Sequence, residues 1–561
     1  MAVILDDFSQ LAFSFEWEQV SIRPEDWLET LEAHRPELLF VESAWSGNGG
    51  SWRYLLTSSS GVKQPVKDLV GWCRKMRIPT VFWNKEDPAH HEDFLDAASL
   101  FDFVFTSDGN MVDGYQKELG HERVGVLRFA AQPAVHNPIV AGQGRHERDI
   151  AFAGMYFRHR HEERREQLDL LLGAALAVGP RMEYGLEIFD RQRGGDPRYR
   201  FPDSVETSVV GSLSYDEMLT AYRAYKVFLN VNTVTNSDTM CARRIFEVTA
   251  CGTPIVSTPS AAIDAVFAAD EVAQVAEQPE AEFVLRALVR NPELRDRMVH
   301  RGQRRIWREH TYSHRVDDVL GAVGLDNHIL SRRPRRVTAL VSSKRPQQLD
   351  HVLTMLGAQR EVDIQLAYLA HGWEVDSDEV RRRAQAVGLE DVAVLQAGSE
   401  VPLGACLNRL AAVADADLVA KIDDDDFYGP NYLGDQLFAL DYSSAEIVGK
   451  CAHYVHLVKS GIMALRFPEK EHRFSHFVMG ATMVAQRAVV HDHPFPEVPA
   501  GEDSGFLRSV VAAGCRVYAT DRFNFVEVRG GSSHTWRITD AEVLASSVVR
   551  DFGTSFEHVL V

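Results

Sequence analysis

Short apolar runs that end in polar residues recur along the chain, and stretches with helical spacing separate them. In the first third, strands are expected at residues 37–42, 79–83 and 101–108, and a helix at 66–76. This alternation is typical of parallel α/β sheets, whose strands are joined by crossover helices. The chain has 561 residues, and such a length predicts about three or four domains rather than one core. We therefore expect an α/β protein with several sheets.

The formal net charge of −20 argues against a general affinity for nucleic-acid phosphates. The six cysteines are scattered, without a CxxC pair, which favours reduced thiols in a cytoplasmic protein over a disulfide or zinc framework. The N-terminus lacks the features of a signal peptide, and no window approaches the ~18 apolar residues that cross a bilayer. The sequence predicts a soluble cytoplasmic protein, and peripheral membrane contact stays open.

Three polar loops follow expected strands in the first two thirds of the chain. A glycine-rich loop at 46–52 would let backbone N–H groups approach an anion, although an ordinary flexible loop is the favoured interpretation. Residues 83–88 lie where ligands bind in open sheets, or form a capped turn before proline. The Arg- and His-rich run 158–165 suits a diphosphate or a solvated helix start.

A sharper pattern spans residues 226–257, which are expected to form a strand, a loop, a short helix ending near Gly252, and a second strand. Arg243 and Arg244 fall near the N-terminus of this helix, and Glu247 lies one turn further on. Two cations beside a helix N-terminus suit a nucleotide diphosphate, and the carboxylate suits ribose hydroxyls. An ion pair within the helix would explain Glu247 as well.

In the last third, four consecutive aspartates at 423–426 follow a short apolar strand. They repel one another unless a cation offsets their charge, and Mg²⁺ and Mn²⁺ prefer such oxygen ligands. An acidic turn closed by Gly429 and Pro430 is the alternative. The strands and helices expected from residue 336 onward place this cluster at the end of a strand.

Two features downstream of the aspartates are also candidates for chemistry. Glu502 and Asp503 precede a helix expected at 505–513, where Asp503 could be a helix N-cap and where the helix N-terminus would keep its carboxylate ionised. His534 is a lone histidine, a residue that is usually structural.

The helix pattern resembles the donor-site helix of GT-B glycosyltransferases, of the group-1-like, spore-maturation type. The similarity rests on Arg244-x-Phe246-Glu247 with Ala250-Cys251-Gly252-x-Pro254, and on landmarks at 83–88, 152–154, 291–295 and 310–315. It covers residues 35–322 and implies two facing Rossmann-like domains, 1–142 and 143–325, with a sugar nucleotide between them and no required metal.

The same resemblance implies that Glu247 contacts the donor ribose and that Arg243 and Arg244 contact the diphosphate. The chain departs from the family at one position. Where retaining group-1 enzymes usually have a second glutamate, this chain has Thr239. The stereochemistry of this half is therefore open.

After a linker at 326–335, residues 336–538 resemble inverting family-2-like GT-A glycosyltransferases, within a domain expected at 336–561. The resemblance implies a base, Asp503 with Glu502 beside it, and Mn²⁺ or Mg²⁺ bound near the aspartates. The implied metal ligands are Asp425, Asp423, Asp426 and His534, the implied ribose contact is Asp424, and the weaker nucleotide contacts are Lys344 and Arg345. The register of ligands within 423–426 stays open by one residue.

The sequence thus predicts a bifunctional glycosyltransferase that uses nucleotide-diphosphate sugars, with a glycan or small-molecule acceptor, plausible in bacterial surface polysaccharide synthesis. Three alternatives remain. In the first alternative, only the GT-A half is catalytic, and the GT-B half binds the acceptor or acts as a scaffold. In the second alternative, the chain is a sugar nucleotidyltransferase, although residues 342–346 lack the glycines that such an enzyme needs. Or the chain binds sugars without catalysis.

Overall fold

The computed structural model describes residues 1–140, 144–325, 334–530 and 538–561. The chain divides into two compact units. Unit 1 comprises Met1–Pro138 and Gly144–Arg332, and unit 2 comprises Ile139–Gln143 and Arg333–Val561. The main division falls inside the linker expected at 326–335.

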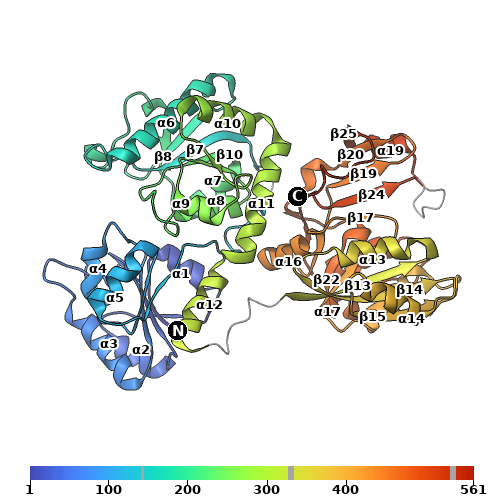
Figure 1. Cartoon of the computed structure of the whole chain (residues 1–561), viewed down its shortest axis with the longest axis horizontal. Coiled ribbons are helices and arrows are strands. Elements are labelled where there is room, and N and C mark those ends of the chain that lie inside the picture. Colours follow the sequence, from blue (N-terminus) through green and yellow to red (C-terminus); the bar gives the residue numbers. More distant parts are fainter. Residues whose placement is uncertain (141–143, 326–333, 531–537) are drawn as a thin grey trace. The chain divides into compact units, whose positions relative to one another are not determined.

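The first half of unit 1 is a six-stranded parallel sheet in the order β2-β1-β3-β4-β5-β6 (Figure 1). Its strands are β1 (Ala2–Ile4), β2 (Val20–Ser21), β3 (Leu39–Glu42), β4 (Thr80–Asn84), β5 (Phe103–Thr106) and β6 (Val124–Val126). Its helices are α1 (Asp7–Phe13), α2 (Trp27–His34), α3 (Gln64–Met76), α4 (His91–Ala98) and α5 (Val112–Leu119). The strands and the helix expected in this region are confirmed, with small shifts at their ends.

The second half of unit 1 is another six-stranded parallel sheet, in the order β12-β11-β10-β7-β8-β9. Its strands are β7 (Arg148–Gly154), β8 (Leu186–Asp190), β9 (Val209–Gly211), β10 (Tyr225–Asn230), β11 (Ile255–Ser257) and β12 (Ala273–Gln274). Its helices are α6 (Glu162–Val178), α7 (Tyr215–Ala224), α8 (Arg243–Ala250), α9 (Ala261–Val266), α10 (Gln278–Arg290), α11 (Pro292–Glu309) and α12 (Tyr312–Val323). The strand order reverses between β7 and β10, and ligands of such sheets bind outside the carboxyl ends of the strands at this point.

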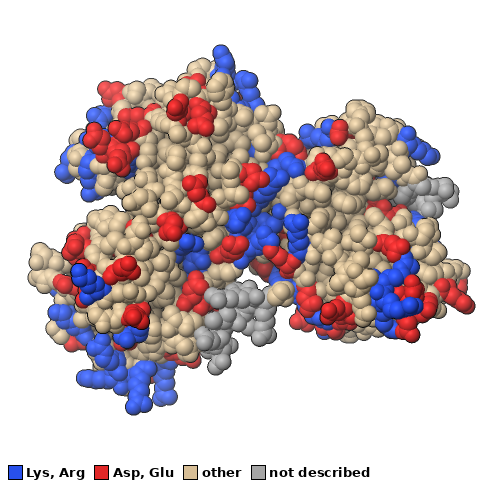
Figure 2. Space-filling view, in the orientation of Figure 1, with Lys and Arg blue, Asp and Glu red and all other residues tan. Residues whose placement is uncertain are grey.

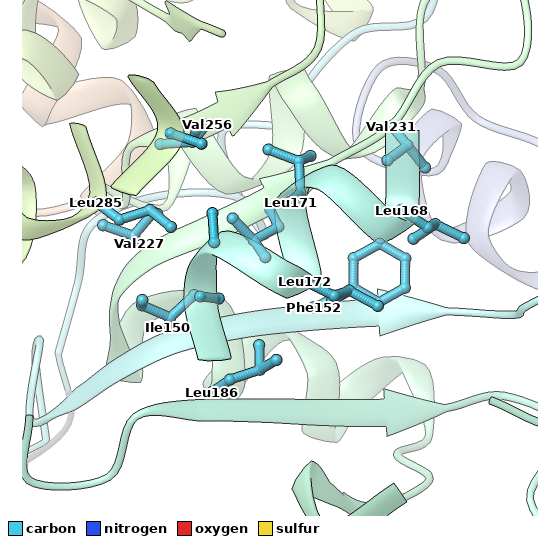
Figure 3. Packing of buried hydrophobic residues seen from close by; sticks show 14 of the residues in the cluster. Ile150, Phe152, Leu168, Leu171, Leu172, Leu186, Val227, Val231, Val256 and Leu285 are labelled. Carbon is cyan, nitrogen blue, oxygen red and sulfur yellow. The ribbon is translucent and has the colours of Figure 1, made fainter. Parts of the chain in front are cut away.

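Helices α6 and α10 cover one face of this second sheet (Figure 3). Leu168, Leu171 and Leu172 share one side of α6 because their spacing matches the helical repeat, and all three are buried. They pack with Ile150 and Phe152 of β7 in one cluster of buried residues. Alternate residues of a strand point to the same face of a sheet, so Ile150 and Phe152 both meet the helix.

The last helix of unit 1 returns to the first half. The Tyr312 amide donates to the Ala131 carbonyl at 3.0 Å, and the Tyr312 ring meets Phe13 edge-on at 4.9 Å between centroids. Arg315 donates from Nε to the Arg128 carbonyl at 2.9 Å. These contacts fix α12 to the first half of unit 1.

Unit 2 contains a mixed eight-stranded sheet, β15-β14-β13-β16-β22-β18-β23-β21. Four parallel strands come first: β13 (Arg335–Ser343), β14 (Val362–His371), β15 (Asp391–Ala397) and β16 (Leu418–Lys421). The remaining strands are β22 (Val484–Gln486), which is antiparallel to β16, with β18 (Ile447–Gly449), β23 (Val517–Ala519) and β21 (Arg473–Phe474). Strand β15 and the antiparallel extension were not among the sequence predictions.

A second, five-stranded sheet, β17-β24-β19-β20-β25, was also not predicted. It comprises β17 (Phe427–Tyr428), β19 (His453–Leu457), β20 (Ile462–Arg466), β24 (Phe525–Arg529) and β25 (Ser547–Phe552). The helices of unit 2 are α13 (Leu349–Gly357), α14 (Ser377–Gln385), α15 (Leu403–Ala412), α16 (Tyr432–Ser443), α17 (Arg487–Asp492), α18 (Glu502–Ala512) and α19 (Asp540–Leu544). The α/β class expected from the sequence is confirmed for both units.

Within the described ranges, no helix has the length and apolar character that a membrane crossing requires. All six cysteines are free thiols. Acidic and basic side chains are interspersed over the face in view, so the net negative charge does not gather in one patch there (Figure 2).

Candidate functional site

The four aspartates of unit 2 follow β16, and the chain turns so sharply there that they have different environments. The Asp423 amide donates to the Tyr428 hydroxyl at 2.9 Å, and this hydroxyl donates to the Ala481 carbonyl at 2.7 Å. Tyr428 is fully buried and therefore fixes the start of the turn. The Asp423 side chain is 39% exposed and that of Asp425 is 24% exposed.

Lys421, the last residue of β16, brings two of the predicted site residues together. Its Nζ lies 2.6 Å from Asp423 Oδ1 and 3.4 Å from Asp503 Oδ2. The lysine side chain is buried, and the two carboxylates keep it charged by raising its pKa against the opposing effect of burial. The aspartate cluster and the predicted base, 80 positions apart in the chain, therefore share one cation.

Asp503 lies in the first turn of α18, which begins at Glu502 with Gly501 at the N-cap position. The interpretation of Asp503 as an N-cap is therefore wrong, because the helix starts earlier than expected. Burial raises the pKa of Asp503 to about 6, while Lys421 opposes the rise and Asp423 and Glu502 add to it. With this pKa the carboxyl is still mostly ionised at neutral pH, although burial has moved the pKa upward.

Gly480 makes room for Asp503. A Cβ added to Gly480 would lie 1.8 Å from Asp503 Oδ2, so any side chain there would displace the carboxylate. This residue belongs to the short turn at Gly480–Thr482, and the sequence alone gave no signal for it. Asp503 Oδ1 is buried and has no hydrogen-bond partner within the described ranges.

Arg345 holds two of the aspartates. It donates to Asp424 and lies 2.9 Å from Asp425 Oδ2, and the Ser343 hydroxyl also donates to Asp424. Arg345 is also a predicted nucleotide contact, and in the structure its charge offsets that of Asp424 and Asp425. Lys344, predicted for the same role, is exposed beside it.

Asp426 points into the protein interior. Its Oδ1 accepts from the Val528 amide of β24 at 3.0 Å, and burial raises its pKa well above the usual range. The structure therefore separates Asp426 from the partly exposed Asp423 and Asp425. His534, the other expected ligand, lies outside the described residues, and the residues that are described contain no group of three or more His, Cys, Asp or Glu placed to hold a metal.

In unit 1, two arginines meet at the point where the strand order reverses. Arg244 lies at the start of α8 with its guanidinium 5.9 Å from the centre of the Phe152 ring, and Arg164 lies in the first turn of α6. Burial and then the charge of Arg244 lower the pKa of Arg164 to about 10. Within the described part of the chain, no carboxylate pairs with either guanidinium. The site is therefore positively charged and suited to an anion.

Glu247 lies on the same helix as Arg244 but is only 1% exposed. Arg243, one helical turn away, forms an ion pair with it, with Nε 2.7 Å from Glu247 Oε1. The hydroxyls of Tyr215 and Tyr222 donate at 3.1 and 3.2 Å, and His136 Nε2 lies 3.6 Å away. Burial raises the pKa of Glu247, and Arg243 with the other partners brings it below its ordinary value. The ion pair within the helix, one of the two interpretations of Glu247, is present.

Thr239 connects the two halves of unit 1. Its hydroxyl accepts from the Gly109 amide at 2.7 Å and donates to the Ser107 carbonyl at 3.0 Å. Two residues earlier, the Ser237 hydroxyl donates to Asp108 at 2.6 Å. The position at which retaining relatives have a glutamate is thus used here for contacts with the loop after β5.

Three charged residues that the sequence did not identify as a group lie at the carboxyl ends of β1, β3 and β4. Lys85 donates to Asp6 and, at 3.0 Å, to Glu42, and the Asp6 amide donates to Glu42. Only Lys85 lay in a loop singled out from the sequence. Asp6 and Glu42 are separated along the chain, and only the parallel sheet brings them together.

Comparison with protein families gives one match in this region. Residues 176–321 match the family model described as glycosyl transferase-like. Over this segment the match agrees with the expected enzyme class, glycosyltransferase. The matched segment contains α8, with Arg243, Arg244 and Glu247, and ends in α12. A comparison with curated proteins finds no match.

Several solved structures align with parts of the chain. They include S. aureus TarS, at 14% identity over 35% of this chain and 36% of that one, with a TM-score of 0.28. S. aureus TarS 1-349 in complex with UDP-GlcNAc aligns at 13% over 38% and 64%, with a TM-score of 0.29.

The mannosyltransferase PcManGT from Pyrobaculum calidifontis, in complex with GDP-Man and Mn²⁺, aligns at 13% identity over 36% of this chain and 59% of that one, with a TM-score of 0.28. The chain thus spans between 36% and 64% of the length of these three proteins. At such TM-scores these likenesses carry no conclusion about fold or function.

Proposed function

We propose that this chain is a bifunctional glycosyltransferase, with unit 1 a GT-B module and unit 2 a GT-A module, each using a nucleotide-diphosphate sugar. The observation that carries the proposal is the convergence of Asp423 and Asp503 on Lys421 at the end of β16. A carboxylate beside an acidic cluster at a strand end supplies a base next to a site for a charged donor.

The carboxylate oxygens of Asp423 and Asp425 in unit 2 suit a hard divalent cation, because both side chains are partly exposed. Asp425 and Asp423 would hold Mn²⁺ or Mg²⁺, which when bound supplies Lewis-acid stabilisation of the departing diphosphate. Asp424, which Arg345 and Ser343 hold in place, is the proposed contact of the donor ribose. Asp426 supports the turn from inside.

Asp503 is the base of unit 2 in this proposal. The acceptor hydroxyl gives its proton to Asp503 while its oxygen bonds to the anomeric carbon, and the nucleoside diphosphate leaves from the opposite face with the electron pair. The anomeric configuration of the transferred sugar is therefore inverted in the product. A pKa of about 6 suits this role, since the group is ionised at neutral pH and yet basic enough to accept a proton.

In unit 1, Arg244 and Arg164 are the proposed contacts of the donor diphosphate, because both are cationic and lie at the N-termini of helices. Arg243 is paired with Glu247 and over Phe8, so its charge is partly neutralised. Glu247 then acts by orienting Arg243 and the start of α8, and a change in its hydrogen bonds would be needed for it to reach a ribose.

Two transferases on one chain suggest successive additions to one glycan. A cytoplasmic role in assembling a bacterial surface polysaccharide, or a glycosylated metabolite, fits this arrangement. The acceptor in both cases is a hydroxyl of a glycan or small molecule.

The test is mass spectrometry of the full chain with a pool of nucleotide sugars, with and without Mn²⁺, in assays that resolve each linkage. Asp425→Asn should abolish one linkage, and Arg164→Ala with Arg244→Ala should abolish the other. Asp378→Asn and Arg181→Ala, two exposed charged residues that contact none of the proposed site residues in the described ranges, are the matched controls. Pyrophosphate release from an NTP and a sugar phosphate would instead favour a nucleotidyltransferase.

A second candidate keeps unit 2 as the only enzyme. The burial of Glu247 and the structural use of Thr239 favour it, since neither residue is free for chemistry in unit 1. In that case the double arginine variant would leave every linkage intact, and unit 1 would serve acceptor binding or scaffolding.

A further inference from the structure

Asp6, Glu42 and Lys85 form a charged cluster at the edge of the first sheet of unit 1, just beyond three adjacent strands. Glu42 is fully buried, and its Oε2 has no hydrogen-bond partner within the described ranges. The Oδ1 atom of Asp6 is also buried and has no hydrogen-bond partner within the described ranges. Asp6 occupies the N-cap position of α1, but its side chain caps no amide of that helix. Two buried carboxyl oxygens are therefore left without the partners that such atoms normally have.

The cluster faces the helix that carries the proposed donor contacts. Arg243 of α8 lies with its guanidinium 3.5 Å from the centre of the Phe8 ring, two residues after Asp6, and its charge acts on Asp6. Lys85 lies 4.2 Å from the same ring centre. Tyr312 of α12 is close enough for the charge of Glu42 to affect its hydroxyl. Lys85, Arg243 and Tyr312 thus interact with the two carboxyls from three other elements.

The two carboxyls differ in protonation. Burial raises the pKa of Glu42, and Asp6 adds to the rise although Lys85 opposes it. Burial also raises the pKa of Asp6, but the hydrogen bond with Glu42 and the charges of Lys85 and Arg243 bring it below its ordinary value. At neutral pH the pair therefore holds one proton, on Glu42, and Asp6 is ionised. Carboxyls whose environments separate them in this way serve different roles in acid–base chemistry.

We propose that Asp6 is the general base of unit 1, oriented by Glu42 and Lys85 as positioning residues; this inference rests on the proposed donor site in the same unit. The acceptor hydroxyl transfers its proton to Asp6 as its oxygen bonds to the anomeric carbon of the donor sugar. The bond from that carbon to the diphosphate breaks, and the nucleoside diphosphate leaves with the electron pair.

This assignment makes unit 1 an inverting transferase. The base lies in the first half of the unit, and the cationic donor contacts Arg164 and Arg244 lie in the second half. Thr239 provides no carboxylate on the donor side, where it holds the loop after β5. A base across from the donor favours attack on the face opposite the leaving group.

The test uses the full chain carrying Asp503→Asn, so that only the unit 1 linkage is formed. Asp6→Asn should bind the nucleotide sugar, measured by calorimetry without acceptor, within about twofold of its parent. Its transfer rate should fall by about 10²–10⁴-fold, the usual contribution of a general base. Asp7→Asn, an exposed neighbour on α1, should leave both unchanged.

The positioning role is tested by the pH profile. Glu42→Leu removes the hydrogen bond that lowers the pKa of Asp6, so the acid limb of the transfer rate should move to higher pH, and Glu42→Gln should move it back. The product, analysed by NMR, should have the inverted anomeric configuration.

Unchanged transfer by Asp6→Asn with donor still bound, or a retained configuration, would overturn the inference and leave the donor site standing. If the parent neither binds a nucleotide sugar nor forms a linkage, the proposed function of unit 1 fails, and this inference fails with it.

Discussion

Lys421 lies 3.4 Å from Asp503 in unit 2, and this contact joins the end of a sheet strand to the first turn of a helix far along the chain. The lysine lowers the pKa of Asp503, and burial raises it more strongly. The balance of the two sets the pH at which the proposed base becomes ionised.

Transfer by unit 2 should therefore increase as pH rises through about 6, because Asp503 accepts a proton only when ionised. Lys421→Met removes a charge that stabilises the carboxylate, so the rising limb should shift to higher pH. Initial rates of the metal-dependent linkage between pH 4.5 and 9 measure this. A limb that stays in place in Lys421→Met would contradict the role of the contact.

Gly480→Ala should impair unit 2 through its effect on Asp503. The added methyl would overlap the carboxylate, so the base must move and the rate constant kcat should fall by at least about tenfold, since small misplacements of catalytic groups are costly. Gly434→Ala in α16 is the matched control, because its Cβ would make only an ordinary contact at 3.5 Å. Equal rates for the two variants would show that Asp503 tolerates displacement.

Glu247→Gln should destabilise unit 1. The substitution leaves the Arg243 guanidinium, which is 24% exposed, without its carboxylate partner. Removing one partner of a buried ion pair costs about 3–5 kcal/mol. Scanning calorimetry of the full chain should show an earlier unfolding transition.

The control for Glu247→Gln is Asp196→Asn, in the exposed Arg198–Asp196 pair, which should leave the transition unchanged. A Glu247→Gln transition that also stays in place would mean that the network around α8 contributes little to stability.

Glu42 should make the stability of unit 1 depend on pH. Its carboxyl has an ordinary pKa of 4.5 and is raised by burial to about 8 in the folded chain, so the folded state binds the extra proton between these values. Stability contributed by that proton is complete below about 4.5 and is lost as pH rises through about 8.

Denaturant unfolding at pH 5, 7 and 9 should therefore show a decline with pH that is smaller in Glu42→Gln, which cannot ionise. Parallel pH dependences for the two proteins would place the proton elsewhere in the Asp6–Glu42 pair.

Local sequence patterns predicted most strands and helices near the sites. The strand before the aspartates and the helix with Glu247 appear close to their expected bounds, because apolar runs and helical spacing reflect burial directly. The short strands of the second sheet of unit 2 were missed. Strands such as Phe427–Tyr428 are two residues long and gain their partners from distant segments.

The site residues divide in the same way. Asp423 and Asp503 were identified from the sequence. Asp426 is the same residue type as Asp423, but its side chain faces the protein interior. A turn of four like residues gives no local signal for which side chain is buried, since that depends on β24 lying behind it. The sequence likewise gave no signal for Gly480, because its role depends on the position of Asp503 in the folded chain.

The sequence by itself determined the α/β class, the polar loops at strand ends and the residue types needed for a donor and a base. Only the tertiary structure decided which of these residues meet. Asp6, Glu42 and Lys85 lie at the carboxyl ends of three different strands, and Lys421 and Asp503 belong to a strand and a distant helix. Parallel strands bring their carboxyl ends to one edge of a sheet, so the charged group that forms there is a property of the fold. The four aspartates likewise became a cluster with distinct members only once burial separated Asp424 and Asp426 from the partly exposed Asp423 and Asp425.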